Sequence, residues 1–240
     1  MIIIPMLGKS SRFFSAGYVR PKYQLPLGDG TVFSYSVQSF QKYFDSEPFL
    51  FLVRQDYEAR SFVSNEASRL GIKDYRIVEF SHETRGQADS VALGISDYHD
   101  NVPILIFNID TIRHNFIYPD AEKMGDGFLE VFKGDGDGWS FIEPGIGTAV
   151  LRTTEKERIS DLCSDGLYFF ARIADFREAF DHYVSSGQHV LGELYVAPLY
   201  NYLIKRGRSI HFQLVDSSLI DHCGLPKDYE KLKLRIPNKL

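Results

Sequence analysis

The most informative stretch of the chain is its beginning, Met1-Ile2-Ile3-Ile4-Pro5-Met6-Leu7-Gly8-Lys9-Ser10-Ser11-Arg12-Phe13. The three isoleucines are β-branched and form a short run, which predicts a buried strand, central in a sheet. The loop of small residues that follows carries Lys9 and Arg12, and Arg20 and Lys22 come shortly afterwards. Backbone N–H groups and cations in such a loop predict a cradle for a polyanion. An ordinary solvated loop is the alternative.

Composition limits the classes of protein that this chain can represent. Its 240 residues are 44% hydrophobic and 14% aromatic, which is enough for a substantial packed core. The net charge of −5 argues against a general nucleic-acid binder, because such proteins need a surplus of cations. Two cysteines, Cys163 and Cys223, give no disulfide framework and no metal spacing. We see no signal peptide and no apolar run long enough for a membrane span, so we expect a cytoplasmic protein.

Strand and helix patterns alternate along the first half of the chain. Strands are predicted where short apolar runs occur, at residues 2–4, 49–53, 75–80 and 102–107. Helices are predicted from helical apolar spacing after the cap residue Thr31, up to Phe44, and at 57–70 and 87–95. Apolar strands that alternate with helices are typical of a parallel sheet covered on both faces.

The pattern changes after Asp110, where seven glycines separate short strand-like segments between residues 125 and 152. Antiparallel strands are predicted there, followed by a strand at 167–170, helices at 176–184 and 196–204, a strand at 210–215 and a short helix after Pro226. The predicted fold is therefore mixed α/β, with a mostly parallel, Rossmann-like central sheet, helices on both faces and a small antiparallel insertion. A single domain, 1–240, is favoured, and the change of pattern after Asp110 divides it into halves at 1–110 and 111–240.

Polar residues follow three of the predicted strands, at the edge where open α/β sheets bind ligands. The first group is the loop Gly8 to Arg12, the second is Glu83 to Ser90, and the third contains Asn108 and Asp110. The carboxylate of Asp110 is a candidate ligand for Mg²⁺, although a turn cap is a common role for such a residue. The Thr84-Arg85-Gly86-Gln87 segment could approach the edge of a heterocycle, or Thr84 could simply cap a helix; the two interpretations are evenly balanced.

Two later segments are less informative by themselves. The pair Glu155-Lys156 follows a predicted strand, and isolated pairs of this kind are usually solvated. Glu193 begins an acidic and aromatic segment, and we expect its side chains mainly to pack in the core. Glu193 itself is a candidate to contact a ligand hydroxyl. The seven histidines show no ligand spacing.

Taken together and in order, these segments resemble the nucleotidylyltransferases that make NDP-sugars. The resemblance begins with Ile4 to Phe13, Ala16-Gly17-Tyr18 and Pro21-Lys22, and it covers nearly the whole chain. The further segments that match the family are Thr84 to Ala88, Asn108-Ile109-Asp110, Trp139-Ser140, Glu155-Lys156, Gly166 to Phe170, Tyr195 to Asn201 and Gly224-Leu225-Pro226-Lys227-Asp228. The most similar subgroup serves the synthesis of capsule and other surface polysaccharides in bacteria.

The resemblance implies a nucleotide-binding half at 1–110, an acceptor-binding half at 111–240 and a role for each matching residue. Arg12 would contact the departing pyrophosphate, Lys22 the α-phosphate, and Asp110 a Mg²⁺ ion. Nucleotide-binding residues would be Leu7, Gly8, Lys9, Ser10, Ser11, Thr84, Gly86, Gln87, Ser90 and Asn108, with Gly86 and Gln87 at the base. Acceptor-binding residues would be Trp139, Glu155, Lys156 and Glu193, with Lys156 at the acceptor's phosphate. Such a reaction needs aligned reactants and well-placed cations, and no side-chain nucleophile.

The chain also departs from the family pattern at three positions. Ser10 replaces the second glycine of Gly-x-Gly-x-Arg, which implies a tighter loop or a use for the hydroxyl. Leu225 replaces a threonine. His222 stands where the family often has aspartate, and because Mg²⁺ prefers oxygen to imidazole nitrogen, we predict that Asp221 is the second metal ligand. His222 and the more distant Asp216 are the alternatives.

The predicted function is transfer of a nucleoside monophosphate from an NTP to a phosphorylated small molecule, most simply a sugar 1-phosphate. The short Thr84 to Gln87 segment favours a pyrimidine, with CTP ahead of UTP. A glycosyltransferase with Asn108-x-Asp110 as a degenerate Asp-x-Asp is an alternative, as are a cytidylyltransferase for a polyol or amino-acid phosphate and an inactive nucleotide-sensing module. We expect no nucleic-acid or membrane partner, and a homodimer is left open.

Overall fold

A computed structural model describes residues 1–187 and 192–236 of the chain. These residues form two compact units that interleave along the sequence. Unit 1 contains residues 1–3, 84–107 and the described part of 118–217, and unit 2 contains residues 4–83, 108–117 and the described part of 218–240. Each unit takes segments from both sides of residue 110, so the units differ from the sequential halves 1–110 and 111–240.

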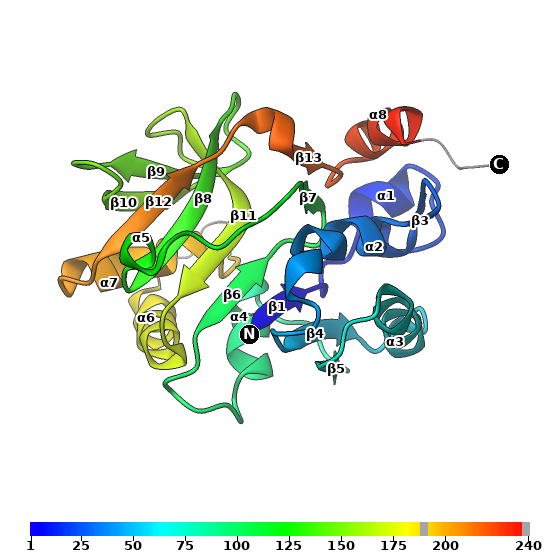
Figure 1. Cartoon of the computed structure of the whole chain (residues 1–240), viewed down its shortest axis with the longest axis horizontal. Helices are drawn as coiled ribbons and strands as arrows, with labels where there is room; N and C mark the ends of the chain where they lie inside the picture. The colour runs from blue at the N-terminus through cyan, green and yellow to red at the C-terminus, as the bar shows by residue number, and fades with distance from the viewer. Residues whose placement is uncertain (188–191, 237–240) are drawn as a thin grey trace. The chain divides into compact units, whose positions relative to one another are not determined.

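Unit 1 is built on a mixed sheet. Its strands are β1 (Ile2–Pro5, whose first two residues belong to this unit), β6 (Ile104–Phe107), β8 (Gly127–Lys133), β9 (Ser140–Pro144), β10 (Val150–Glu155), β11 (Leu162–Phe170) and β12 (Ile210–Leu214). β11 is central and pairs antiparallel with β6, β8 and β9, as can be followed in Figure 1. β1 pairs parallel with β6, and β12 pairs parallel with β8. The helices of this unit are α4 (Gln87–Gly94), α5 (Ala121–Met124), α6 (Ile173–Ser186) and α7 (Tyr200–Lys205).

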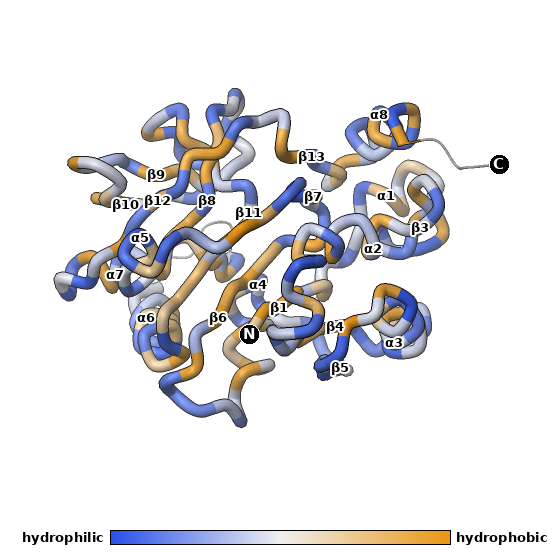
Figure 2. The backbone as a smooth tube through the Cα atoms, in the orientation of Figure 1, coloured by the Kyte–Doolittle hydropathy of each residue, from blue (hydrophilic) through white to orange (hydrophobic). Residues whose placement is uncertain are grey.

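The core of unit 1 is apolar and rich in aromatic side chains. All four residues of β6 are fully buried, and Figure 2 shows this strand in the colours of hydrophobic residues. Tyr200 of α7 stacks on Phe170 with a centroid distance of 4.5 Å, and its hydroxyl donates to the carbonyl of Phe169 at 2.7 Å. α7 is therefore fixed to the sheet both by packing and by a buried, satisfied polar group.

Unit 2 contains the loop after β1 and the elements around it. Its strands are β2 (Pro26–Leu27), β3 (Gly30–Thr31), β4 (Phe49–Arg54), β5 (Tyr75–Phe80), β7 (Thr111–Arg113) and β13 (Ile220–His222). β4 and β5 are parallel, whereas β2 with β3 and β7 with β13 form small antiparallel pairs. Its helices are α1 (Ser11–Ser15), α2 (Val32–Val37), α3 (Ala59–Leu70) and α8 (Pro226–Arg235). The short 3₁₀ helices η1 (Lys22–Gln24) and η2 (Gln38–Tyr43) also lie in unit 2. Of the other two, η3 (Ala197–Leu199) lies in unit 1, and η4 (Ser217–Leu219) begins at the last residue of the unit 1 segment.

Local chemistry explains where two helices of unit 2 begin. Thr31 caps α2 as predicted: its hydroxyl accepts from the Ser34 amide, and the Ser34 hydroxyl accepts from the Thr31 amide. The helix predicted at 57–70 begins only at Ala59, because Tyr57 and Glu58 adopt left-handed φ angles of 49° and 53°. The helix predicted up to Phe44 changes to the 3₁₀ helix η2 at Gln38, and Phe40 departs from helical angles.

The predicted fold class, a mixed α/β protein with a mostly parallel central sheet and added antiparallel strands, is confirmed. β11 is longer than the predicted 167–170, and the short strands β2, β3, β7 and β13 were not predicted. Within residues 1–187 and 192–236, the structure contains no helix with the length and apolar character that a membrane crossing requires.

Candidate active site

The loop after β1 is shaped by Ser10. This residue has a left-handed φ of 52°, a conformation that glycine adopts more easily, and its hydroxyl accepts a hydrogen bond from the Lys22 amide at 3.1 Å. The serine that replaces the family's glycine therefore uses its hydroxyl to join the two basic segments of the loop. Arg12 lies exposed at the start of α1, and the position that a Gly8 side chain would take is open.

Lys22 and Asp110 form the central ion pair of unit 2. The Lys22 ammonium lies 2.5 Å from Oδ2 of Asp110, and the two side chains are 20% and 23% exposed. Burial by itself would raise the pKa of Asp110, but the charge and hydrogen bond of Lys22 outweigh it and lower the pKa overall. The carboxylate is therefore held in its ionised form, which is the form that binds a cation.

Gly224, from the predicted closing motif, lies against this carboxylate. A Cβ on Gly224 would meet Asp110 Oδ2 at 2.7 Å, and the neighbouring Cys223 amide donates to the Asp110 carbonyl at 2.8 Å. Only a residue without a side chain leaves this oxygen accessible, which explains why position 224 is a glycine.

Asp221 has a different environment from the one predicted for a metal ligand. Its carboxylate accepts from His114 Nε2 at 2.9 Å through Oδ2 and from Arg235 through Oδ1. Burial would raise the pKa of Asp221, but these two partners outweigh it and lower the pKa. Since both oxygens are engaged, the predicted role of Asp221 as second metal ligand would require both contacts to open.

The side chains near Asp110 determine whether Mg²⁺ can bind there. Among the described residues, no three His, Cys, Asp or Glu side chains form a group that could hold a metal ion. Mg²⁺ is commonly held by one or two carboxylates together with substrate phosphates and water. Asp110, ionised and kept accessible by Gly224, fits this pattern as a single protein ligand.

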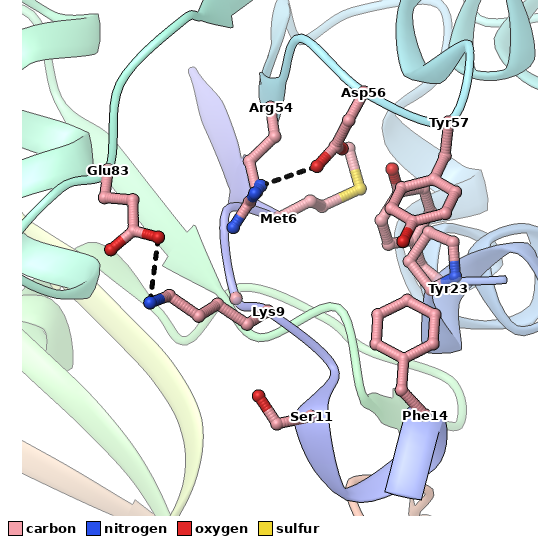
Figure 3. A pocket seen from close by; sticks show the side chains of 11 residues that line it. Met6, Lys9, Ser11, Phe14, Tyr23, Arg54, Asp56, Tyr57 and Glu83 are labelled. Atoms are coloured by element: carbon pink, nitrogen blue, oxygen red, sulfur yellow. Dashed lines mark hydrogen bonds and ion pairs between the residues drawn. The ribbon is translucent and has the colours of Figure 1, made fainter. Parts of the chain in front are cut away.

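A pocket of about 240 Å³ lies beside the same loop (Figure 3). Gly8, Lys9 and Ser11 of the loop line it, together with Phe14 and Tyr57, whose rings stack with centroids 5.5 Å apart. Two ion pairs border the pocket, Lys9–Glu83 and Arg54–Asp56, each at 2.8 Å. Arg54, Asp56 and Tyr57 were not predicted as site residues, because a strand end with mixed charges is common.

In unit 1, the segment from Thr84 to Ser90 is tied together by its own side chains. The Thr84 and Ser90 hydroxyls are 2.7 Å apart, Ser90 donates to the Gly86 carbonyl at 3.0 Å, and the Arg85 amide donates to Asp89 at 2.9 Å. Gly86 is the N-cap of α4, so Thr84 does not cap this helix. Ser90 is buried and has a structural role in this conformation.

The backbone angle and the close packing at position 86 both favour glycine. Its φ is 131°, and a Cβ at this position would lie 2.6 Å from the Leu194 carbonyl oxygen. The backbones of the two segments are joined by hydrogen bonds from Leu194 N to Arg85 O and from Ala88 N to Leu194 O, at 2.7 and 2.9 Å. The predicted base-binding segment and the residue after Glu193 are therefore held together.

The predicted acceptor residues also meet in unit 1. Lys156 has a φ of 56°, and its amide donates to the Trp139 carbonyl at 2.8 Å. Its ammonium donates to the Tyr195 hydroxyl and lies 4.5 Å from the centre of that ring, while the Tyr195 hydroxyl donates to Glu193. Tyr195 is a contact that the sequence analysis assigned only to packing.

Glu155 lies beside this group but is buried. Ser140 donates to its carboxylate, and burial raises the pKa of Glu155 against the lowering effects of Ser140 and Lys156. The side chain next to Lys156 is therefore a carboxyl group that protonates more readily than an exposed one.

Comparison with known proteins was made by family model, by curated sequence and by solved structure. The first two gave no match. The nucleoside-diphosphate-sugar pyrophosphorylase from Vibrio cholerae RC9 is 49% identical, with 97% of this chain and 99% of that chain covered and a TM-score of 0.92. UDP-glucose pyrophosphorylase complexed with UDP-glucose is 14% identical, with 98% and 97% covered and a TM-score of 0.75. The inositol-1-phosphate CTP transferase from T. maritima is 16% identical, with 100% and 97% covered and a TM-score of 0.73.

The last two likenesses concern the fold alone, whereas the first extends to the sequence over nearly all of both chains. The sequence and the fold shared with the Vibrio cholerae protein define a nucleotidyltransferase. More narrowly, the chain belongs to the family of nucleoside-diphosphate-sugar pyrophosphorylases. The predicted membership of the nucleotidylyltransferases that make NDP-sugars is therefore confirmed.

Proposed function

We propose that this protein transfers a nucleotidyl group from an NTP to a sugar 1-phosphate and releases pyrophosphate. The observation that carries the proposal is the Lys22–Asp110 pair, a cation and an ionised carboxylate 2.5 Å apart beside the small-residue loop. A reaction at an α-phosphate needs both a cation for the phosphate oxygens and an oxygen ligand for a metal ion.

In the proposed reaction, a phosphate oxygen of the acceptor attacks the α-phosphorus of the NTP. A new P–O bond forms, the bond between the α-phosphorus and the bridging oxygen breaks, and pyrophosphate leaves with the electron pair. Lys22 stabilises the charge that develops on the α-phosphate oxygens, and Arg12 stabilises the leaving pyrophosphate. Asp110 would hold Mg²⁺, which when bound would supply Lewis-acid stabilisation of phosphate charge.

The other assigned residues bind the substrates. Leu7, Gly8, Lys9, Ser10, Ser11, Thr84, Gly86, Gln87, Ser90 and Asn108 bind or shape the site for the nucleotide, with Gly86 and Gln87 at the base. On the acceptor side, Lys156 binds the phosphate, and Trp139, Glu155 and Glu193 contact the sugar. The arrangement of Lys156 on Tyr195, with Tyr195 bonded to Glu193, supports a common role for these side chains.

The product would be an activated sugar for surface polysaccharide synthesis. Release of pyrophosphate, measured with each NTP, Mg²⁺ and a panel of sugar 1-phosphates, tests the proposal. We expect turnover with a pyrimidine NTP, CTP ahead of UTP, and much slower turnover with ATP or GTP.

Phosphorylated polyols and amino acids belong in the panel as alternative acceptors. Release of a nucleoside diphosphate from a nucleotide sugar, without pyrophosphate formation from any NTP, would indicate a glycosyltransferase instead. The cytoplasmic location stays a prediction, and a homodimer stays open.

A further inference from the structure

In unit 1, the ammonium group of Lys156 contacts a tyrosine hydroxyl. It donates to the hydroxyl of Tyr195 and lies 4.5 Å from the centre of that ring, and the same hydroxyl donates to the carboxylate of Glu193. A single oxygen atom therefore lies between a cation and an anion. The proposed reaction uses Lys156 and Glu193 to bind the acceptor, but it assigns no separate role to the tyrosine between them.

The backbone fixes both partners of this contact. Lys156 has a left-handed φ of 56°, which is strained for a residue with a side chain, and its amide donates to the Trp139 carbonyl at 2.8 Å. Leu194, which precedes Tyr195, donates through its amide to the backbone of residues 85–88 and accepts from it through its carbonyl, at 2.7 and 2.9 Å. The ammonium and the hydroxyl therefore meet on two anchored segments of the same unit.

The tyrosine hydroxyl is held in its neutral form. Burial, the hydrogen bond to Glu193 and the negative charges of Glu193 and Glu155 all raise the pKa of Tyr195. A hydroxyl that donates to a carboxylate is also polarised, so its oxygen becomes a stronger acceptor. Tyr195 therefore offers the ammonium a strong hydrogen-bond acceptor that carries no charge.

A neutral partner leaves the ammonium available to an anion. If Lys156 paired directly with a carboxylate, an incoming phosphate would have to compete with a full negative charge. A hydrogen bond to a hydroxyl fixes the position of the ammonium without cancelling its charge, and it needs only one of the three N–H groups. Lys156 and Glu193 are exposed and Tyr195 is half-buried, so a ligand can reach the ammonium.

We propose that Tyr195 is a positioning residue for Lys156: its hydroxyl holds the ammonium for the acceptor's phosphate and keeps it apart from the carboxylate of Glu193. This inference rests on the proposed function, which assigns Lys156 to the phosphate of a sugar 1-phosphate. It has a specific consequence. Once the hydroxyl is removed, the cation and the carboxylate pair directly, and Glu193 then opposes the binding of phosphate.

Inorganic phosphate is the probe for a binding test. Its binding is followed by NMR through the side-chain signals of Lys156 in lysine-labelled protein, and Lys156→Gln identifies these signals by their loss. We expect Tyr195→Phe to weaken phosphate binding about 10-fold, because a hydrogen bond to a charged group is lost. The double variant Tyr195→Phe/Glu193→Gln should recover most of this loss, since it has no carboxylate to neutralise the ammonium. A tyrosine with a merely structural role would give no such rescue.

Tyr202→Phe is the matched control. Tyr202 is a half-buried tyrosine of the same unit whose ring also lies near a cation, with the guanidinium of Arg206 6.0 Å from its centre. We expect this variant to bind phosphate like the wild type. Three results would overturn the inference: unchanged affinity in Tyr195→Phe, equal losses in the single and the double variant, or wild-type Lys156 signals that do not respond to phosphate.

A measurement on the wild-type chain covers the case in which Tyr195→Phe does not fold. Nuclear Overhauser effects in the free protein should link the Hε protons of Lys156 to the ring protons of Tyr195. Their absence would also overturn the inference.

Steady-state kinetics distinguishes this inference from the proposed function. With the acceptor that gives the fastest pyrophosphate release, Tyr195→Phe should raise the KM of the acceptor about 10-fold and leave the KM of the NTP within about 2-fold. Turnover by the wild type, with phosphate binding and acceptor KM unchanged in Tyr195→Phe, defeats only this inference. The expected phosphate binding without turnover on any acceptor defeats only the proposed function.

Discussion

Lys22 and Asp110 lie 88 residues apart in sequence, and the ammonium nitrogen of one is 2.5 Å from a carboxylate oxygen of the other. Lys22 comes from the short 3₁₀ helix η1, and Asp110 comes from the segment between β6 and β7. The pair gives the proposed reaction both of the charges that it needs at the α-phosphate. The charge of Lys22 also keeps Asp110 in its ionised form.

Replacing Lys22 tests this relationship. We expect Lys22→Ala to lower kcat by at least about 10²-fold, because it removes a cation that faces developing charge in a preorganised site. Steady-state kinetics measures the effect, and circular dichroism should stay native. Arg20→Ala, which removes an exposed cation from the same loop, is the control and should keep near wild-type kcat. A Lys22→Ala enzyme as fast as the control would show that this loop does not hold the triphosphate.

We expect replacement of Asp221 to lower the stability of the fold more clearly than it lowers the affinity for Mg²⁺. Asp221→Asn alters the contacts of this carboxylate with His114 and Arg235, whose side chains are 41% and 62% exposed, so we expect a cost of about 1 kcal/mol or less. For a chain of this size, such a cost lowers Tm by at most about 2–4 °C. The pKa of Asp221 is lowered from 3.8, so its stabilisation is present above that pH and is lost as the pH falls further.

Thermal unfolding at pH 7 and at pH 3 measures the contribution of Asp221, and the difference between wild type and variant should shrink at the lower pH. Mg²⁺ titrations with the same variant provide the contrast. A large loss of Mg²⁺ affinity with unchanged Tm would establish Asp221 as the second metal ligand.

Glu155 should reduce stability at neutral pH. Its pKa is raised from 4.5 by burial, so the folded protein binds this proton more tightly than the unfolded chain does. The free energy of unfolding therefore falls as the pH rises from 4.5 through the higher pKa of the folded state. We expect Glu155→Gln to raise Tm at pH 7 and to have a smaller effect at pH 4, while turnover with the sugar phosphate decreases.

Glu143→Gln is the control for this prediction, because Glu143 is exposed on the adjacent strand and pairs with Arg152. It should leave Tm and turnover nearly unchanged at both pH values. If Glu155→Gln is destabilised at pH 7, the buried carboxylate contributes more through its bond from Ser140 than its burial costs.

Gly86→Ala should be much more damaging than alanine at another glycine with positive φ. The added Cβ would lie 2.6 Å from the Leu194 carbonyl oxygen, at a φ of 131°. We expect a loss of about 3 kcal/mol from strain and overpacking together. Gly136→Ala has a φ of 82° and open space around the new Cβ, so it should lose only about 1 kcal/mol. Urea unfolding of both variants measures the difference, and equal losses would mean that the contact with Leu194 yields easily.

Much of the fold could be predicted because it depends on local patterns. Buried strands such as Ile104–Phe107 are continuous apolar runs, and Thr31 is a typical cap residue for the helix that follows it. The predicted ends of helices were wrong where the backbone adopts a conformation that the residue types do not favour. Tyr57 and Glu58 fit a helical pattern, yet they form a strained turn that is held by Gln24 from elsewhere in the chain. A contact of this kind leaves no periodic signal in the sequence.

The sequence by itself determined the class of fold, the loop after the first strand and the position of Asp110 at a strand end, because strand periodicity and loop composition are local properties. Tertiary structure decided the partners: Lys22 pairs with Asp110, Asp221 with His114 and Arg235, and Tyr195 with Lys156. It also placed Arg54 and Asp56 in the same pocket as residues of the loop after β1. Which charges meet depends on how distant segments pack, and packing brings together residues whose types and spacing give no indication of one another.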